Sequence, residues 1–114
     1  MITINAKTDP RIAETFPEDP YSNLTIITAK KTVHLQLAFL AMDSDYFAGI
    51  DPDTTRVDLS ELPEEPLMRI LHSLYGAQLT AASLADLCEL YPVIVHLGIQ
   101  DYKYQIEQEI QGRP

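Results

Sequence analysis

Several short runs of the sequence alternate apolar and polar residues, which is the pattern of β-strands. Residues 24–28 and 33–35 interleave β-branched or apolar side chains with threonine and histidine, which is typical of strands. The polar link 29–32 between them is short, so the two runs predict a hairpin. Residues 56–59 alternate polar and apolar, which indicates a third strand with one wet face. Near the start, residues 2–5 also alternate and allow a short strand.

Later segments carry the spacing of amphipathic helices instead. One broad stripe recurs at i, i+3, i+4, i+7 and i+8 and consists of Leu67, Ile70, Leu71, Leu74 and Tyr75. Ser60 is a candidate N-cap for this helix, and Gly76 is expected to end it. A second helix is predicted from Leu84, Leu87, Cys88 and Tyr91, and Pro92 should kink or restart it. Ile99, Tyr102 and Ile106 mark a final helix.

Shorter helices are expected between the strands. Leu37, Leu40 and Ala41 fall at helical spacing, with Phe39 off that stripe and facing another element. Ser44 is the predicted N-cap of the next short helix. Residues 11–16 allow one or two helical turns before prolines break the chain. The order of elements indicates an α+β fold, with a small sheet packed against helices.

Composition limits the function classes. The chain has 114 residues, which suits one domain, and a formal net charge of −9. This acidity argues against binding nucleic acid or anionic membranes, because both interactions depend on Lys and Arg. No secretory signal or membrane-spanning run is present, so we expect an intracellular protein of the cytoplasm or nucleus.

The candidate chemistry is sparse. The histidines are His34, His72 and His96, and no two have the spacing of metal ligands. Cys88 is the single cysteine; it excludes an internal disulfide, and its place on the apolar helix stripe predicts a buried, unreactive thiol. The sequence shows no nucleophile motif or phosphate-binding loop. We therefore expect no metal, no cofactor and no enzymatic activity, although a small enzyme of unrecognised type stays open as a third alternative.

Residues Asn23–Phe47 then carry a resemblance. They read NLTIITAKKTVHLQLAFLAMDSDYF and resemble the opening of a BTB/POZ domain, whose usual form is D-V-x-L-x-V, a polar turn and F-x-A-H-K-x-V-L-A-x-x-S-x-Y-F. Downstream, residues 57–79, VDLSELPEEPLMRILHSLYGAQL, resemble I-x-L-x-D-x-x-x-x-x-F-x-x-L-L-x-F-I-Y-T-G-x-L. Residues 84–99 resemble V-x-E-L-L-x-x-A-x-x-L-Q-I.

The resemblance implies a small three-stranded sheet packed against five or six helices. The domain would span residues 23–111, preceded by an N-terminal strand and short helix in residues 1–22. The sequence departs from the usual pattern at Gln36 and Leu37, which replace a histidine and a basic residue that usually shape the dimer-facing pocket.

By the same resemblance, the function is protein–protein interaction: homodimerisation and recruitment of partners, such as a corepressor or a cullin, within a transcriptional regulator or a ubiquitin-ligase adaptor. The alternative is a monomeric or heteromeric substrate-adaptor subunit of a cullin-RING ubiquitin ligase. Candidate dimer-interface residues are Ile2, Ile4, Ile12, Phe16, Leu37 and Phe39. Candidate residues of a cullin-like partner surface are Tyr46, Ile50 and Asp51.

Overall fold

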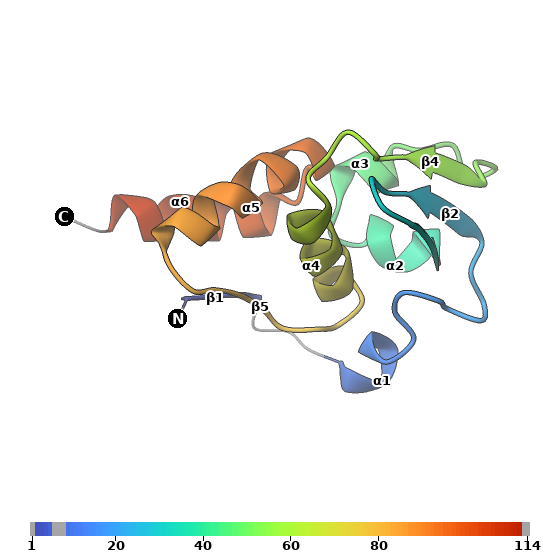
Figure 1. Ribbon diagram of the computed structural model, residues 1–114, viewed down its shortest axis with the longest axis horizontal. Coiled ribbons are helices and arrows are strands. Elements are labelled where there is room, and N and C mark those ends of the chain that lie inside the picture. Colours follow the sequence, from blue (N-terminus) through green and yellow to red (C-terminus); the bar gives the residue numbers. More distant parts are fainter. Residues whose placement is uncertain (1, 6–8, 113–114) are drawn as a thin grey trace.

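The computed structural model describes residues 2–5 and 9–112, and these form an α+β fold of two small sheets and six helices. Figure 1 shows the three-stranded sheet at one end of the molecule and the long C-terminal helices at the other, with α4 between them. The elements in chain order are β1 (Ile2–Asn5), α1 (Pro10–Ala13), β2 (Leu24–Ile27), β3 (Thr32–Leu35), α2 (Leu37–Ala41), α3 (Asp45–Ala48), β4 (Arg56–Asp58), α4 (Glu64–Leu74), β5 (Leu79–Ala81), α5 (Leu84–Leu97) and α6 (Gln100–Gln111).

The three-stranded sheet has the order β3-β2-β4. Strands β2 and β3 form the predicted antiparallel hairpin, in which Ile26 is opposite Val33. Strand β4 lies parallel to β2, with Val57 opposite Ile26. These three side chains belong to the core, which explains the alternation seen in the sequence. The predicted third strand is confirmed.

A second, two-stranded sheet pairs β1 with β5 in antiparallel fashion. The alternation in residues 2–5 predicted β1, but β5 was not predicted. Leu79 and Ala81 of β5 and Ile4 of β1 are buried. A strand of three residues has too little alternation to show a period, and its partner lies at the opposite end of the chain.

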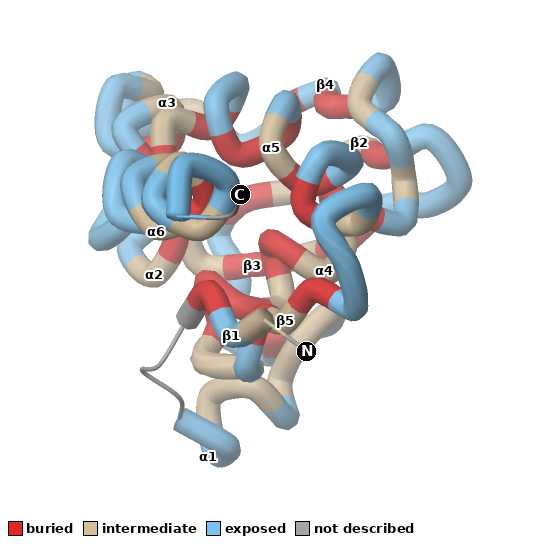
Figure 2. Tube along the Cα trace, turned by 90° about the vertical axis from the view of Figure 1, so that its left-hand side faces the viewer, coloured by how far each residue is buried: buried red, intermediate tan, exposed pale blue. Residues whose placement is uncertain are grey.

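Helix α4 carries the predicted apolar stripe into the centre of the core. Figure 2 shows buried residues gathered around α4, which packs against α5, β5 and α2. The predicted start is wrong, because Pro63 and not Ser60 is the N-cap, and the helix begins at Glu64. Proline fixes φ near the helical value and lacks the N–H that a first turn leaves unpaired, so the two prolines Pro63 and Pro66 favour a later start.

Helix α5 is continuous through Pro92, so the predicted restart of the helix at this residue is wrong. Its buried residues are Leu87, Leu90, Val93, Ile94 and Leu97. This face is rotated from the predicted stripe, and Cys88 is exposed. The prediction of a buried thiol is therefore also wrong. The predicted spacing was helical, but the actual core face follows i, i+3, i+7 and i+10, and both faces of α5 are rich in apolar residues.

Helix α3 is fixed to the junction of α5 and α6. Ser44 is its N-cap, as predicted, and accepts a hydrogen bond from the Phe47 N–H (3.3 Å). The Ser44 hydroxyl also donates to the Leu97 carbonyl oxygen (2.5 Å). The Asp45 N–H donates to the carbonyl oxygen of Gly98 (3.1 Å), which caps α5 in the left-handed region with φ 63°.

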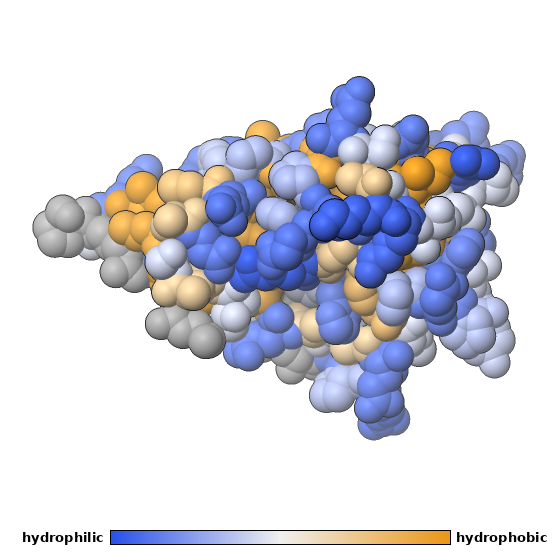
Figure 3. All heavy atoms as spheres, in the orientation of Figure 1, coloured by the Kyte–Doolittle hydropathy of each residue, from blue (hydrophilic) through white to orange (hydrophobic). Residues whose placement is uncertain are grey.

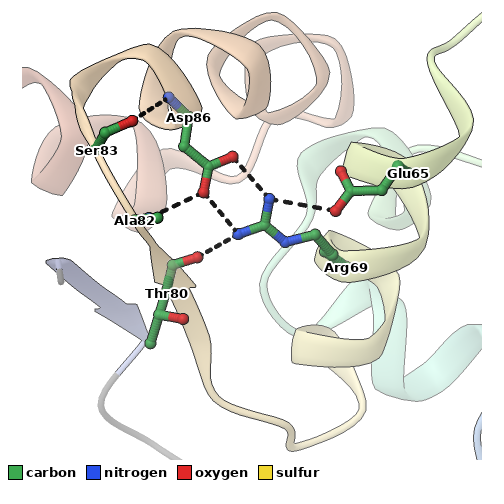
Figure 4. A network of polar contacts seen from close by, with 6 residues as sticks. All are labelled: Glu65, Arg69, Thr80, Ala82, Ser83 and Asp86. Carbon is green, nitrogen blue, oxygen red and sulfur yellow. Dashed lines mark hydrogen bonds and ion pairs between the residues drawn. The ribbon is translucent and has the colours of Figure 1, made fainter.

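A polar network joins α4, β5 and α5 at one point (Figure 4). Arg69 makes a two-pronged contact with Asp86, from Nη1 to Oδ1 (2.9 Å) and from Nη2 to Oδ2 (3.1 Å). Arg69 Nη2 also donates to the Thr80 carbonyl oxygen. The hydrogen bond from Arg69 lowers the pKa of the Asp86 carboxyl, and the Asp86 carboxylate in turn raises the pKa of Arg69. The network thus fixes the short strand β5 between two helices.

The outer surface is mixed. The face shown in Figure 3 is hydrophilic across its middle. Apolar residues are visible at the end near the C-terminus of α6 and again near β4 at the other end. Within the part of the chain that the structure describes, no helix combines the length and the apolar character needed to cross a membrane.

Replacement of Gly98 by alanine should destabilise the fold by about 1–3 kcal/mol. An alanine at φ 63° is strained, and its Cβ would lie 2.9 Å from the Asp45 Cβ. The measurement is urea unfolding followed by circular dichroism. Gly49→Ala is the control, since Gly49 has an ordinary φ of −88° and should change the free energy of unfolding less. Equal effects of the two substitutions would contradict this account of the α3–α5 junction.

Candidate protein-interaction surfaces

The outer face of α2 is the least polar exposed helix surface near the N-terminal segment. The run Gln36–Met42 contains no charged residue, and within α2 only Leu40 is fully buried. Ala38 is exposed, and Met42 keeps 77% of its surface accessible. Apolar side chains that a fold does not bury mark a candidate binding surface when they lie together.

The start of α2 is fixed from outside the helix. Gln36 occupies the N-cap position but gives no side-chain cap. Instead, Asn23 Oδ1 accepts a hydrogen bond from the Leu37 N–H (2.9 Å). An amide N–H at a helix start has no partner within the helix, so this contact sets the direction of α2 relative to β2.

A buried polar network lies under the same helix. Asp19 is only 5% exposed, and its Oδ2 accepts hydrogen bonds from the Tyr75 hydroxyl (2.7 Å) and from Gln36 Nε2 (2.8 Å). The Gln36 backbone N–H donates to the Tyr75 hydroxyl oxygen (2.6 Å), and the Tyr21 N–H donates to Asp19 Oδ1 (2.9 Å). Three separate segments therefore meet at one carboxylate.

This network controls the ionisation of its members. Burial by itself would raise the pKa of the Asp19 carboxyl, but the hydrogen bonds from Tyr21, Tyr75 and Gln36 outweigh it, and the pKa lies below its usual value. Burial raises the pKa of the Tyr75 hydroxyl, and the Asp19 carboxylate raises it further. At neutral pH, Asp19 is thus a carboxylate and Tyr75 a neutral donor.

An aromatic group extends from this network to the N-terminal segment. Phe16 stacks on His72 with ring centroids 4.7 Å apart, and Phe39 meets Tyr75 edge-on at 5.3 Å. His72 Nε2 donates to the Ala13 carbonyl oxygen (3.2 Å). Phe39 thus faces another element, as expected, and Phe16 is held against α4.

The six candidate dimer residues do not form one continuous group. Ile12, Phe16, Leu37 and Phe39 are half-buried and lie on α1, α2 or the segment between them. Ile2 is half-buried on β1. Ile4 is 1% exposed and fills the core of its own chain, so its side chain offers no surface to a partner.

Ile12 and Phe39 share a hollow of about 260 Å³ that sequence reasoning did not anticipate. Its lining comes from α1, α2, α4 and α6 and consists of Asp9, Ile12, Phe39, Met42, Asp43, Ser73, Leu74, Tyr75, Gly76, Asp101 and Tyr102. The sequence signal for Met42 was its place in the uncharged run Gln36–Met42, which is too long to be buried on every side. The acidic residues of the rim come from distant parts of the sequence and carried no signal.

The second candidate surface consists of Tyr46 on α3 and of Ile50 and Asp51 in the loop after it. The Tyr46 ring packs against those of Phe47 (5.2 Å between centroids) and His96 (5.5 Å). Ile50 is half-buried, and Asp51 is exposed, with its Oδ1 accepting the Asp53 N–H (2.8 Å). The structure thus adds His96 to the predicted surface, where it flanks Tyr46.

The titratable groups with shifted pKa values serve the fold. Asp19 is held by Tyr75 and Gln36, Asp86 is held by Arg69, and the Tyr91 hydroxyl donates to Glu107 (2.7 Å), which lowers the pKa of the Glu107 carboxyl. Among the described residues, no group of three His, Cys, Asp or Glu side chains is placed to hold a metal ion.

Comparison with solved structures identifies the architecture. The chain is similar to the BTB domain of zebrafish PATZ1, with a TM-score of 0.74 and 14% identity over 90% of this chain and 87% of that one. It is also similar to the BTB domain of human Gigaxonin, with a TM-score of 0.68 and 17% identity over 92% of this chain and 96% of that one. No protein-family model and no curated protein sequence matches the chain. The fold is that of a BTB/POZ domain, as the sequence resemblance implied.

Tyr75→Phe should lower the free energy of unfolding by about 1–3 kcal/mol, because it leaves the buried Asp19 carboxylate and the Gln36 N–H each short of a partner. Asp19 stabilises the fold above its unfolded pKa, and this contribution is lost as the pH falls through its lower folded pKa. The variant should raise that folded pKa, so the difference from wild type should narrow in acid. Chemical unfolding at several pH values measures both effects.

Tyr104→Phe is the matched control, because Tyr104 is 62% exposed. Equal stability of the two variants at neutral pH would show that the Tyr75 hydroxyl does not support the network.

Proposed function

We propose that this chain, whose fold is that of a BTB/POZ domain, is a protein–protein interaction module that self-associates through the outer face of α2. The observation that carries the proposal is the uncharged run Gln36–Met42, in which Leu40 alone of the α2 residues is fully buried. In a chain with a net charge of −9, a helix with one exposed and three half-buried residues and without a single charged residue is unusual for a surface that faces only water.

The neighbouring apolar residues enlarge this face. Leu37 lies on α2 itself, and Ile12 and Phe16 are half-buried beside it in the N-terminal segment. A symmetric dimer places the same patch of each copy against the other, so one apolar face is sufficient for both sides. Stable interfaces bury roughly 1,200–2,000 Å² in total, which requires α2 together with parts of α1. Ile2 would lie at the margin, and Ile4 takes no part because it is buried within its own chain.

We assign the module a binding role and no catalytic one. The support is that the four carboxyl groups with lowered pKa values, Asp19, Asp58, Asp86 and Glu107, each accept hydrogen bonds from groups of the same chain, which is the pattern of structural networks. Such a module would hold partners within a larger assembly, such as a transcriptional regulator or a ubiquitin-ligase adaptor.

Ala38→Glu tests the self-association. Ala38 is exposed at the second position of α2, where a glutamate also complements the helix dipole, so folding should be preserved. Sedimentation velocity at micromolar concentration should show a wild-type dimer. The variant should dissociate at least about tenfold more readily, because the buried charge has no partner.

Ala85→Glu is the matched control, since Ala85 is exposed at the same position of α5. A wild-type chain that is monomeric throughout would contradict the proposal. So would a loss of the dimer in Ala85→Glu alone, which would move the interface to α5.

A second candidate function uses the surface around Tyr46. The packing of Tyr46 between Phe47 and His96, next to the exposed Asp51, favours a heteromeric contact with a cullin-type protein. The whole chain should then retain a recombinant cullin in a pull-down, and Asp51→Lys should weaken the retention. Glu61→Lys is the control for a general change of charge, because Glu61 is exposed and lies outside this surface. Absence of retention by the wild-type chain would reject this candidate.

A further inference from the structure

The hollow at the C-terminal end of α2 combines an apolar floor with an acidic rim. Ile12, Phe39 and Leu74 supply apolar lining, and the Tyr102 side chain, 4% exposed, closes the base. Met42 stands at the edge with 77% of its surface accessible. Its volume of about 260 Å³ lies below the roughly 300–1,000 Å³ typical of small-molecule sites, and it suits an anchoring side chain of a peptide.

Three carboxylates surround this floor, and each comes from a different part of the chain. Asp9 precedes α1, Asp43 follows α2, and Asp101 lies in the first turn of α6. None of the three forms an ion pair with any residue of the segments 2–5 and 9–112, and the lining contains no Lys, Arg or His. Among the described residues, therefore, no cation is paired with the charges of the rim.

The buried hydroxyl at the base responds to these charges. Burial raises the pKa of Tyr102 to about 12, and the carboxylates of Asp43 and Asp101 contribute to the increase. Asp43 and Asp101 thus both lie close enough to the Tyr102 hydroxyl to act on it, so their charges add on that side of the hollow.

We infer that this hollow binds a segment of a partner protein in which a lysine or arginine lies next to a large apolar side chain. The apolar side chain packs against Ile12, Phe39 and Tyr102, and the cation meets the carboxylates of Asp43 and Asp101. Apolar contact supplies most of the affinity, and the charges select basic segments and speed their association.

The net charge of the chain favours a basic segment over a second copy of the chain as the occupant of the hollow. Each copy carries a net charge of −9, and a second acidic rim placed against the first would add repulsion. The uncharged outer face of α2 has no such conflict. The inference therefore concerns a contact that adjoins the proposed self-association and shares Ile12 with it, but that uses the acidic rim and is complete within one chain.

The test begins with a random peptide library displayed on phage and selected on the intact chain. Enriched peptides should carry Lys or Arg within one helical turn of Leu, Ile, Phe or Met. The most enriched peptide is then labelled with fluorescein, and its dissociation constant is measured by anisotropy. Asp43→Asn combined with Asp101→Asn should weaken binding about 5- to 30-fold, and raising the salt should weaken wild-type binding towards the same value.

Glu61→Gln combined with Glu89→Gln removes the same number of charges from exposed positions outside the hollow and should leave binding within about twofold. Circular dichroism melts check that both double variants fold. The absence of any enriched peptide, enriched peptides without a basic residue, or equal binding by the Asp43/Asp101 variant would overturn the inference.

Ala38→Glu separates this contact from self-association. Unchanged peptide binding by that variant supports a site carried by the single chain, whether or not the chain forms a dimer. Loss of peptide binding in a folded Ala38→Glu variant would overturn the inference, because Ala38 does not line the hollow.

Discussion

The hydroxyl of Tyr75 is the point at which the elements of the proposed binding surface are joined. It donates to Asp19 and accepts from the Gln36 N–H, so it connects the end of α4 with the segment before β2 and with the start of α2. Each of these groups is buried or nearly so, and a buried polar group without a partner costs free energy. All of these polar groups have hydrogen-bond partners only when the three segments are arranged in this way. The position of α2 follows from that arrangement. Gly76, which follows directly with φ 99°, lets the Asp9 backbone approach closely and adds a hydrogen bond from Asp9 N–H to the Gly76 carbonyl oxygen (2.8 Å).

The sequence predicts most elements because their core faces have a period. The hairpin of β2 and β3, strand β4 and the stripe of α4 all place apolar residues on one side, and a pattern of that kind is legible without a structure. The errors occur where apolar residues are present on more than one side. Helix α5 buries Leu87, Leu90 and Ile94 but also exposes Leu84 and Val95, so the spacing of its apolar residues does not identify the core face, and Cys88 was placed on the wrong one. Strand β5 and the late start of α4 at Glu64 depend on tertiary partners that no local pattern records.

The candidate surfaces are less predictable for a related reason. The sequence resemblance gave the fold, and the predicted residues Ile12, Phe39 and Tyr46 do lie on partly exposed surfaces. Ile4 was a candidate dimer residue but is buried in the core. The sequence pattern of a short alternating strand does not show whether an apolar residue faces the core or a partner. The acidic rim of the hollow could not be predicted from the sequence, because Asp9, Asp43 and Asp101 come together only when α1, α2 and α6 pack against the end of α4.

The distribution of charge gives the two proposed contacts different physical characters. A face without charges can meet its own copy at little electrostatic cost, so association through α2 should depend on apolar area, and added salt should not weaken it. A hollow whose carboxylates form no ion pair among the described residues favours a cation, and that contribution is screened as the ionic strength rises. The net charge of −9 adds a general repulsion between copies, and this repulsion is weakest where each copy presents only Leu37, Ala38 and Ala41. An acidic domain that uses apolar area to hold itself and carboxylates to select a basic partner can therefore keep the two kinds of binding separate on adjoining surfaces of one short helix.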